Sequence, residues 1–179
     1  MRAFALLALV TIVSGMGCSG SDDAASEGSL STPSAQQQPA ANADAGQVRQ
    51  AIETASARFS DAARRGDAAG LVATYAENAV VMQPNTPAWR GRDAIRKGWA
   101  GFLSSATVRE FSLHTEDVMT SGDLAVQTGT YSMTLQPKTA GARELTDKGK
   151  FVVAWRKQAD GSWKAVRDIY NSDMPPGGS

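Results

Sequence analysis

Apolar residues recur at intervals of three and four positions along one early segment of the chain. This set consists of Val48, Ile52, Ala55, Phe59 and Ala62. Such spacing predicts a helix with one apolar face. Gly66 is suited to end that helix, and the Asp67 carboxylate is suited to cap a shorter helix over 68–75.

A strand and a third helix are predicted next. The apolar, β-branched run 79–83 favours a strand, and Pro84 ends it. The third helix begins near Arg92, where Asp93 complements the positive end of the helix dipole. The proline-bracketed loop between this strand and this helix is where we expect a pocket entrance.

After Ser105 the pattern changes to alternation of apolar and polar residues. The segments 108–119, 124–136, 146–157 and 163–171 each predict a strand. Short, turn-rich connections at 121–123, 137–142 and 160–162 favour antiparallel neighbours. Helices followed by a run of strands predict an α+β fold, with three N-terminal helices packed on one face of a mostly antiparallel sheet.

The first 18 residues have the pattern of an export signal. Arg2 precedes an apolar run from Ala3 to Val13, which is shorter than the roughly 20 residues that a spanning helix requires. The sole cysteine, Cys18, follows Gly15-Met16-Gly17, and this run resembles a bacterial lipoprotein signal. The expectation is lipidation of Cys18 and a membrane anchor facing the periplasm. The alternative is cleavage near Gly17, a free thiol and a secreted protein.

Composition divides the remaining chain. Residues 19–45 contain one large apolar side chain, Leu30, and no aromatic residue, which predicts a disordered tether. Residues 46–174 form one domain by size, and 175–179 form a frayed tail.

Charge and residue types exclude several classes of function. The chain has 18 Lys and Arg against 18 Asp and Glu, and its basic residues are dispersed, so no nucleic-acid partner is expected. No group of residues has metal-ligand spacing, and we expect neither a metal nor a cofactor.

The domain resembles the nuclear transport factor 2-like superfamily, and more narrowly its SnoaL-like group. The stretches that carry the resemblance are FSDAARRGDAAGLVATYAENAVVMQP (59–84), RGRDAIRKGWAGFL (90–103), GDLAVQTGTYSM (122–133) and GKFVVAWRKQADGSWKAVRDIYNSD (149–173). The resemblance implies a cone formed by helices on a strongly bent sheet, with a cavity suited to a small, largely apolar ligand. It implies no particular activity, because this fold hosts many.

Ketosteroid isomerase belongs to the same group, but its catalytic groups are absent from this chain. The position of its general base is Gln83, and the position of its oxyanion tyrosine is Phe59. The strand that would supply its second acid reads Phe151-Val-Val-Ala-Trp155. An amide and a phenyl ring cannot perform that proton transfer, so we reject steroid-type isomerisation and leave open whether the protein is an enzyme.

Two residues remain candidates for acid–base chemistry. Asp168 lies on a strand with Val166 and Tyr170 on the same face, where burial would raise its pKa. The favoured alternative for Asp168 is an ion pair with an arginine such as Arg90. His114, the only histidine, is the second candidate, and its alternative is a structural or surface role.

The leading hypothesis is an envelope-anchored domain that binds a small apolar molecule. Residues expected to contact that molecule are Tyr75, Gln83, Trp89, Trp99, Tyr131, Asp168 and Asn171. An enzyme of cyclase, dehydratase or hydrolase type is the alternative. A third hypothesis is a homodimer, with an exposed sheet face formed by Tyr131, Met133, Phe151, Val153 and Trp155.

Overall fold

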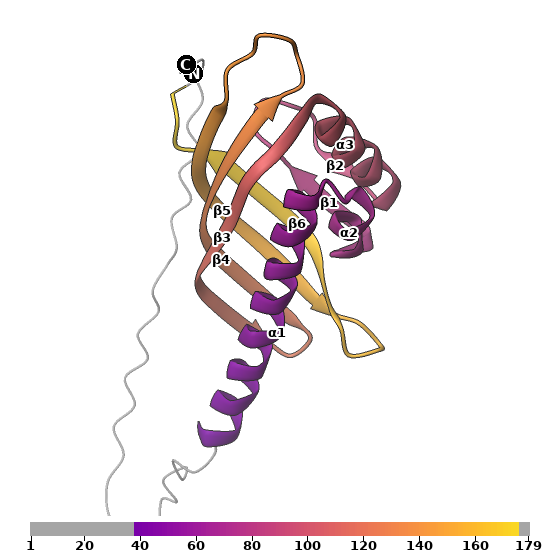
Figure 1. Cartoon of the computed structure of the whole chain (residues 1–179). Coiled ribbons are helices and arrows are strands. Elements are labelled where there is room, and N and C mark those ends of the chain that lie inside the picture. Colours follow the sequence, from indigo (N-terminus) through magenta and orange to yellow (C-terminus); the bar gives the residue numbers. More distant parts are fainter. Residues whose placement is uncertain (1–37, 176–179) are drawn as a thin grey trace, which may run out of the picture. The chain divides into compact units, whose positions relative to one another are not determined.

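The computed structural model describes residues 38–175, with side chains from residue 44 onward. The signal, Cys18 and most of the expected tether therefore lie outside the described residues. The elements are α1 (Gln38–Arg65), α2 (Ala68–Ala73), β1 (Tyr75–Met82), β2 (Trp89–Arg90), α3 (Arg92–Ser105), β3 (Ala106–Ser121), β4 (Leu124–Pro137), β5 (Leu145–Lys157) and β6 (Trp163–Ser172). Figure 1 shows the helices together on one side of the sheet.

The six strands form one curled, open sheet with the order β2-β1-β6-β5-β4-β3. All neighbouring strands are antiparallel except β1 and β6, which are parallel. Helix α1 runs across the concave face of the sheet, and α2 and α3 lie beside β1 (Figure 1). The α+β architecture expected from the order of the sequence patterns is confirmed.

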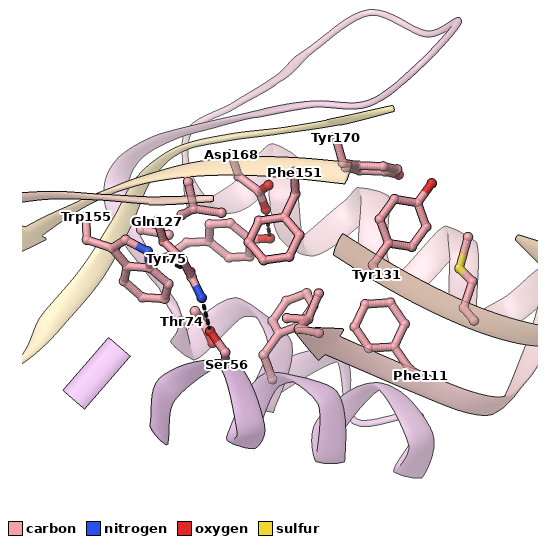
Figure 2. Close-up of a pocket in the computed structure, with 15 residues that line it drawn as sticks. Ser56, Thr74, Tyr75, Phe111, Gln127, Tyr131, Phe151, Trp155, Asp168 and Tyr170 are labelled. Carbon is pink, nitrogen blue, oxygen red and sulfur yellow. Dashed lines mark hydrogen bonds between the residues drawn. The ribbon is translucent and has the colours of Figure 1, made fainter. Parts of the chain in front are cut away.

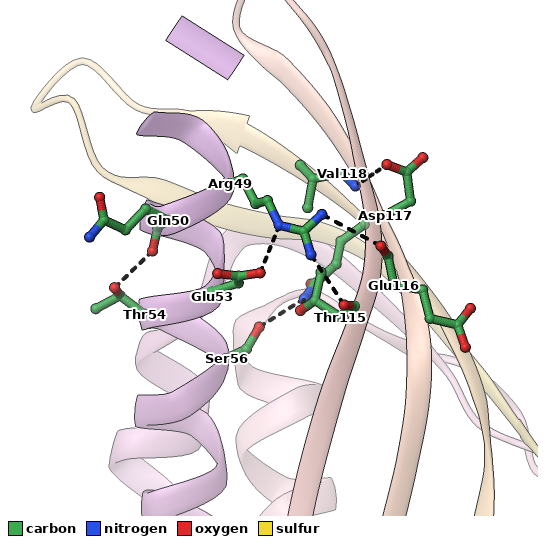
Figure 3. Close-up of polar contacts among 10 residues, drawn as sticks. Arg49, Gln50, Glu53, Thr54, Ser56, Thr115, Glu116, Asp117 and Val118 are labelled. Carbon is green, nitrogen blue, oxygen red and sulfur yellow. Dashed lines mark hydrogen bonds and ion pairs between the residues drawn. The ribbon is translucent and has the colours of Figure 1, made fainter. Parts of the chain in front are cut away.

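Strand β3 bends at two β-bulges, after Val108 and after Thr115. A bulge leaves a residue unpaired and increases the local bend of its strand. At the second bulge, the Arg49 guanidinium of α1 donates to the carbonyls of Thr115 at 3.3 Å and Glu116 at 3.5 Å, while its Nε lies 2.9 Å from Glu53 (Figure 3). The bend is thereby fixed against the helix that it wraps around.

The capping residues act as the sequence indicates. Gly66 follows α1 with φ of 67°, a left-handed conformation that glycine adopts without steric strain. The Asp67 side chain then accepts a 2.9 Å hydrogen bond from the Gly70 N–H at the start of α2. The short helix α2 thus leads the chain from the end of α1 into β1.

Several element boundaries differ from the sequence prediction: α2 ends at Ala73 instead of residue 75, and β3 extends over Ala106–Ser121 instead of 108–119. Strand β1 begins at Tyr75 instead of Ala79, because Tyr75 pairs in parallel with Ala165 of β6 and belongs to the sheet. The short strand β2, which pairs with Val80 and Val81, was not predicted. Helix α1 begins at Gln38, before the boundary expected at residue 46, in an alanine-rich run that favours helix.

The face that β4 and β5 turn toward α1 is the buried one. Tyr131, Phe151, Val153 and Trp155 are all at most 8% exposed. The expectation that they form an exposed dimer patch is therefore wrong, since the curl of the sheet encloses them. The homodimer itself stays a prediction, and its patch would have to lie on the outer face.

Candidate functional site

A cavity lies between the concave face of the sheet and α1. It is formed by fifteen residues and encloses about 80 Å³ (Figure 2). The lining consists of Ser56, Phe59, Thr74, Tyr75, Phe111, Leu113, Gln127, Tyr131, Met133, Phe151, Val153, Trp155, Ala165, Asp168 and Tyr170. This volume is well below the roughly 300–1,000 Å³ of sites for drug-sized ligands, so the cavity suits a molecule of a few heavy atoms.

Aromatic rings make up much of the wall. The Phe59 ring packs edge-on against Tyr75 at 6.1 Å and against Phe111 at 5.9 Å between ring centroids. On the opposite side, Tyr131 and Tyr170 pack edge-on at 5.7 Å. Such pairs hold rings in fixed orientations, so the wall has a defined shape.

Two glycines of the sheet make room for these rings. A Cβ at Gly149 would lie 2.1 Å from the Asn171 carbonyl oxygen and 2.8 Å from the Tyr131 ring. A Cβ at Gly129 would lie 2.8 Å from the Phe151 ring. The absence of a side chain at both positions lets the strands and rings approach closely.

The central polar group of the cavity is the Asp168 carboxyl. Its Oδ2 accepts a 2.7 Å hydrogen bond from the Tyr75 hydroxyl (Figure 2). Burial raises the pKa of Asp168 to about 6, and the bond from Tyr75 opposes the rise only in part. Among residues 44–175, Asp168 has no ion-pair partner, and the expected pair with the exposed Arg90 is wrong.

Tyr75 is the second member of this pair and is 1% exposed. Burial and the neighbouring Asp168 carboxylate raise its pKa well above the ordinary value for tyrosine. The Trp99 indole N–H lies near the Tyr75 hydroxyl and lowers the pKa of Tyr75 in part. The two groups do not meet the geometry of a hydrogen bond. Tyr75 therefore stays protonated and serves as a hydrogen-bond donor.

A second tyrosine–aspartate pair lies at the other end of the aromatic wall. The Tyr131 hydroxyl donates to Asp147 Oδ2 at 2.9 Å, and the Ser172 hydroxyl donates to Asp147 Oδ1 at 2.5 Å. Burial and Asp147 raise the pKa of Tyr131. Burial, together with Asp168 and Asp147, raises the pKa of Tyr170 to about 12. The Tyr170 hydroxyl thus lies in the field of both carboxylates.

Gln127 joins α1 to the sheet at the cavity wall and is 1% exposed. Its Nε2 donates to Ser56 Oγ at 3.1 Å and to Thr115 Oγ1 at 2.8 Å. Its Oε1 accepts from the Trp155 indole N–H at 3.0 Å. Because its polar atoms are satisfied by the protein, Gln127 is a structural anchor and is poorly suited to hold a ligand.

Comparison with known proteins identifies the family of this domain. A family model of the SnoaL-like domain matches residues 56–166. The chain belongs to the SnoaL-like domain family. A comparison with curated proteins gave no significant match.

Solved structures share the fold of this SnoaL-like domain. A ketosteroid isomerase-like protein from Erwinia carotovora atroseptica is 25% identical, with a TM-score of 0.64, covering 70% of this chain and 96% of its own. A nuclear transport factor 2-like superfamily protein from Salmonella enterica serovar Typhimurium is 16% identical, with a TM-score of 0.64, covering 74% and 95%. A Novosphingobium aromaticivorans protein, provisionally named a scytalone dehydratase, is 21% identical, with a TM-score of 0.63, covering 74% and 89%.

Three of the seven expected ligand contacts of the SnoaL-like domain line the cavity, namely Tyr75, Tyr131 and Asp168. Gln83 and Trp89 lie outside the lining. With the Gln83 amide oriented by its hydrogen bonds, its oxygen accepts from the Trp89 indole N–H at 2.9 Å. The Gln83 side chain after β1 and the Trp89 side chain of β2 therefore satisfy each other.

The remaining candidates also lie away from the cavity. Trp99 packs behind it, edge-on against Phe59 at 5.5 Å. Asn171 and His114 are exposed and take no part in the lining. His114 faces the outer side of β3, because the inward positions beside it are Leu113 and Thr115. This placement argues against His114 as a general base within the cavity.

Most of the lining residues were not among the expected ligand contacts. The alternation of apolar residues along β5 could have identified some of them. Phe151, Val153 and Trp155 alternate along β5 and are cross-strand partners of inward positions of β4. Alternation places them on the same face as Tyr131. Phe59, at the isomerase tyrosine position, also lines the cavity.

The described part of the chain holds neither a cluster of metal ligands nor a helix suited to cross a membrane. Within 38–175, no three His, Cys, Asp or Glu residues come together in a group that could hold a metal ion. No helix in this part of the chain is long and apolar enough to span a membrane.

Proposed function

We propose that this domain binds a small, largely apolar molecule in the cavity beneath α1. The single observation that carries the proposal is an aromatic cavity whose wall contains a hydrogen-bonded carboxyl, Asp168. Apolar walls with a few placed polar groups are typical of small-molecule sites. The aromatic wall supplies affinity, and the Tyr75–Asp168 pair supplies orientation.

We further propose that the protein is exported and held at the bacterial envelope by a lipid on Cys18. The support is the sequence alone: Arg2, the apolar run 3–13 and the cysteine that follows small residues. Replacing Cys18 by Ser should move the protein from the membrane fraction to the soluble fraction. Unchanged membrane association in that variant would contradict the anchor.

Native mass spectrometry of the purified protein tests the binding proposal. We expect a mass excess from a small molecule in the natural protein. The variant Leu113→Trp fills the cavity from its wall and should abolish that excess. The variant Leu124→Trp adds the same ring at a position that is 45% exposed and should keep the excess. Equal retention in both variants would place the molecule elsewhere.

The pKa of Asp168 favours a second candidate function, acid–base catalysis. A carboxyl with a pKa near 6 can both accept and donate a proton near neutral pH. A cyclase or dehydratase acting on the bound molecule would use Asp168 as its base, with Tyr75 donating to it. Asp168→Asn should then abolish turnover of the molecule identified by mass spectrometry, also at concentrations that saturate the variant. Unchanged turnover would dismiss Asp168 as the catalytic residue.

A further inference from the structure

The charged side chains that line the cavity are of one sign, and the nearest cations bond backbone carbonyls, Arg64 that of Phe111 and Arg92 that of Tyr75. Among the described residues, the lining contains one carboxylate, Asp168, and no lysine, arginine or histidine. Asp147 lies behind Tyr131 and adds a second carboxylate near the same wall. An anionic ligand would meet like charge there without a cation among the described lining residues, and like charges in a site of low dielectric repel strongly.

One oxygen of Asp168 is available to a ligand. Tyr75 occupies Oδ2, and no other described group donates a hydrogen bond to this carboxyl. A carboxylate surrounded by apolar groups is destabilised unless donors or a counter-charge satisfy it. The cavity therefore presents an unsatisfied acceptor that a cationic donor would fit best.

The rest of the wall favours the same kind of ligand. The faces of aromatic rings carry negative potential and attract organic cations within about 6 Å. Seven of the fifteen lining residues are aromatic: Phe59, Tyr75, Phe111, Tyr131, Phe151, Trp155 and Tyr170. An ammonium group with a short hydrocarbon body matches both the rings and the carboxylate.

Resting on the proposed binding function, we propose that the ligand is a small organic amine in its protonated form, with its ammonium group on Asp168. The volume of about 80 Å³ restricts the body of the amine to a few carbon atoms. The proposal names the chemical class of the ligand, which neither the fold nor the family supplies.

The surroundings of Asp168 determine how binding depends on pH. Tyr170 of the same strand lies near Asp168, and so does Tyr75 of β1. The strand partners of Asp168 are Val81 of β1 and Val153 of β5, neither of which titrates. The only causes that shift its pKa are burial and the hydrogen bond from Tyr75. Protonation near pH 6 would therefore remove the counter-charge of the amine, while an alkylamine stays protonated throughout.

The test is a titration of the full-length protein with four matched probes. Changes of the amide chemical shifts in NMR spectra measure the binding of each probe. The probes are butylamine, 1-butanol, butyrate and pentane, which have unbranched chains of four or five carbon atoms and differ in the end group. At pH 7.5 we expect butylamine to bind about tenfold more tightly than butanol, because a charge-assisted hydrogen bond is roughly twice as strong as a neutral one. Butyrate should bind most weakly.

Two variants and a second pH separate the explanations. Asp168→Asn should bring butylamine to the level of butanol, whereas Glu144→Gln, which removes a charge at an exposed position, should leave the preference intact. Between pH 7.5 and pH 5 the amine should lose about tenfold in affinity, following the ionised fraction of a group with a pKa of about 6. Butanol should change little.

The outcomes distinguish failure of this proposal from failure of the binding function. Equal binding of butanol and butylamine would overturn the amine proposal and leave the cavity as a binding site. An amine preference that survives Asp168→Asn would also overturn it. Binding of none of the four probes, in a sample that carries no bound molecule, would overturn both proposals.

Discussion

The buried carboxyl of Asp168 predicts an unusual pH dependence of stability. Its pKa rises from 3.8, the ordinary value, to about 6 in the folded protein. Between these two pH values the folded state holds a proton that the unfolded state has released. The contribution of Asp168 to stability is therefore fully present below pH 4 and is lost as the pH rises through 6.

The size of the loss follows from the shift. One pKa unit corresponds to about 1.36 kcal/mol, so a shift from 3.8 to about 6 gives an upper limit of about 3 kcal/mol. Water that enters the cavity screens the carboxylate and lowers the expected value to about 2 kcal/mol. This is a large share of the free energy of unfolding of an ordinary domain, which is about 5–15 kcal/mol.

Asp168→Asn removes the charge and keeps an oxygen that can accept from Tyr75. The difference in unfolding free energy between variant and natural protein should increase by about 2 kcal/mol, in favour of the variant, between pH 4 and pH 7.5. Urea denaturation followed by tryptophan fluorescence measures this difference, and it cancels the titration of all other groups. Glu144→Gln should give a flat difference. A flat or falling difference for Asp168→Asn would refute the reasoning.

Further predictions concern the neighbours of the cavity. Tyr75→Phe removes the one bond that lowers the pKa of the cavity carboxyl, so that pKa should rise above 6 in a carbon-13 NMR titration; an unchanged value would contradict the hydrogen bond. Gly98→Ala places a Cβ 2.3 Å from the Trp89 ring and should lower the unfolding free energy by roughly 1–3 kcal/mol. Gly101→Ala meets open space in the same helix and should raise it by up to about 1 kcal/mol, so equal effects in urea denaturation would refute the packing argument. Gln127→Leu leaves the side chains of Ser56, Thr115 and Trp155 without this hydrogen-bond partner, and should lower the unfolding free energy by about 3 kcal/mol in the same assay. A loss below about 1 kcal/mol would show that these three side chains find other partners.

The order and type of the elements were predictable because each follows from a local pattern. Helical spacing before Gly66 and alternation after Ser105 depend only on which residues face the core. Strand β4 illustrates the accuracy, since 124–136 was predicted and Leu124–Pro137 is observed. The short strand β2 carries too few residues for any periodicity, and its pairing with β1 comes from tertiary structure alone.

The direction in which a strand face points was less predictable. Alternation shows that Tyr131 and its neighbours share a face, but not whether that face meets α1 or solvent. The bulges of β3 and the curl they produce decide this. On β6, a register shift beside Val166 changes the alternation, so Ala165 lines the cavity with Asp168, whereas Val166 was expected to share the face.

Individual contacts were the least predictable part of the site. Trp89 was expected to be available because it was predicted to lie in a loop, and Gln83 because its amide could bond a ligand, yet their side chains bond to each other and Trp89 belongs to β2. Asp168 was placed on the correct strand with the correct neighbour, Tyr170. The partner of Asp168 is Tyr75, 93 residues away in sequence, and only the parallel pairing of β1 with β6 brings the two together.

The loss of stability at neutral pH and the proposed class of ligand both follow from the charge on Asp168, which has no ion-pair partner among the described residues. At neutral pH the folded protein holds an ionised Asp168 without a cation, and a bound ammonium ion would relieve that destabilisation. An amine at about 100 times its dissociation constant stabilises the folded state by about 2.7 kcal/mol through mass action. Because the amine binds weakly once Asp168 is protonated, a given amine concentration should raise the melting temperature more at pH 7.5 than at pH 5. Hydrocarbon of the same length lacks the charge, so its effect should be independent of pH.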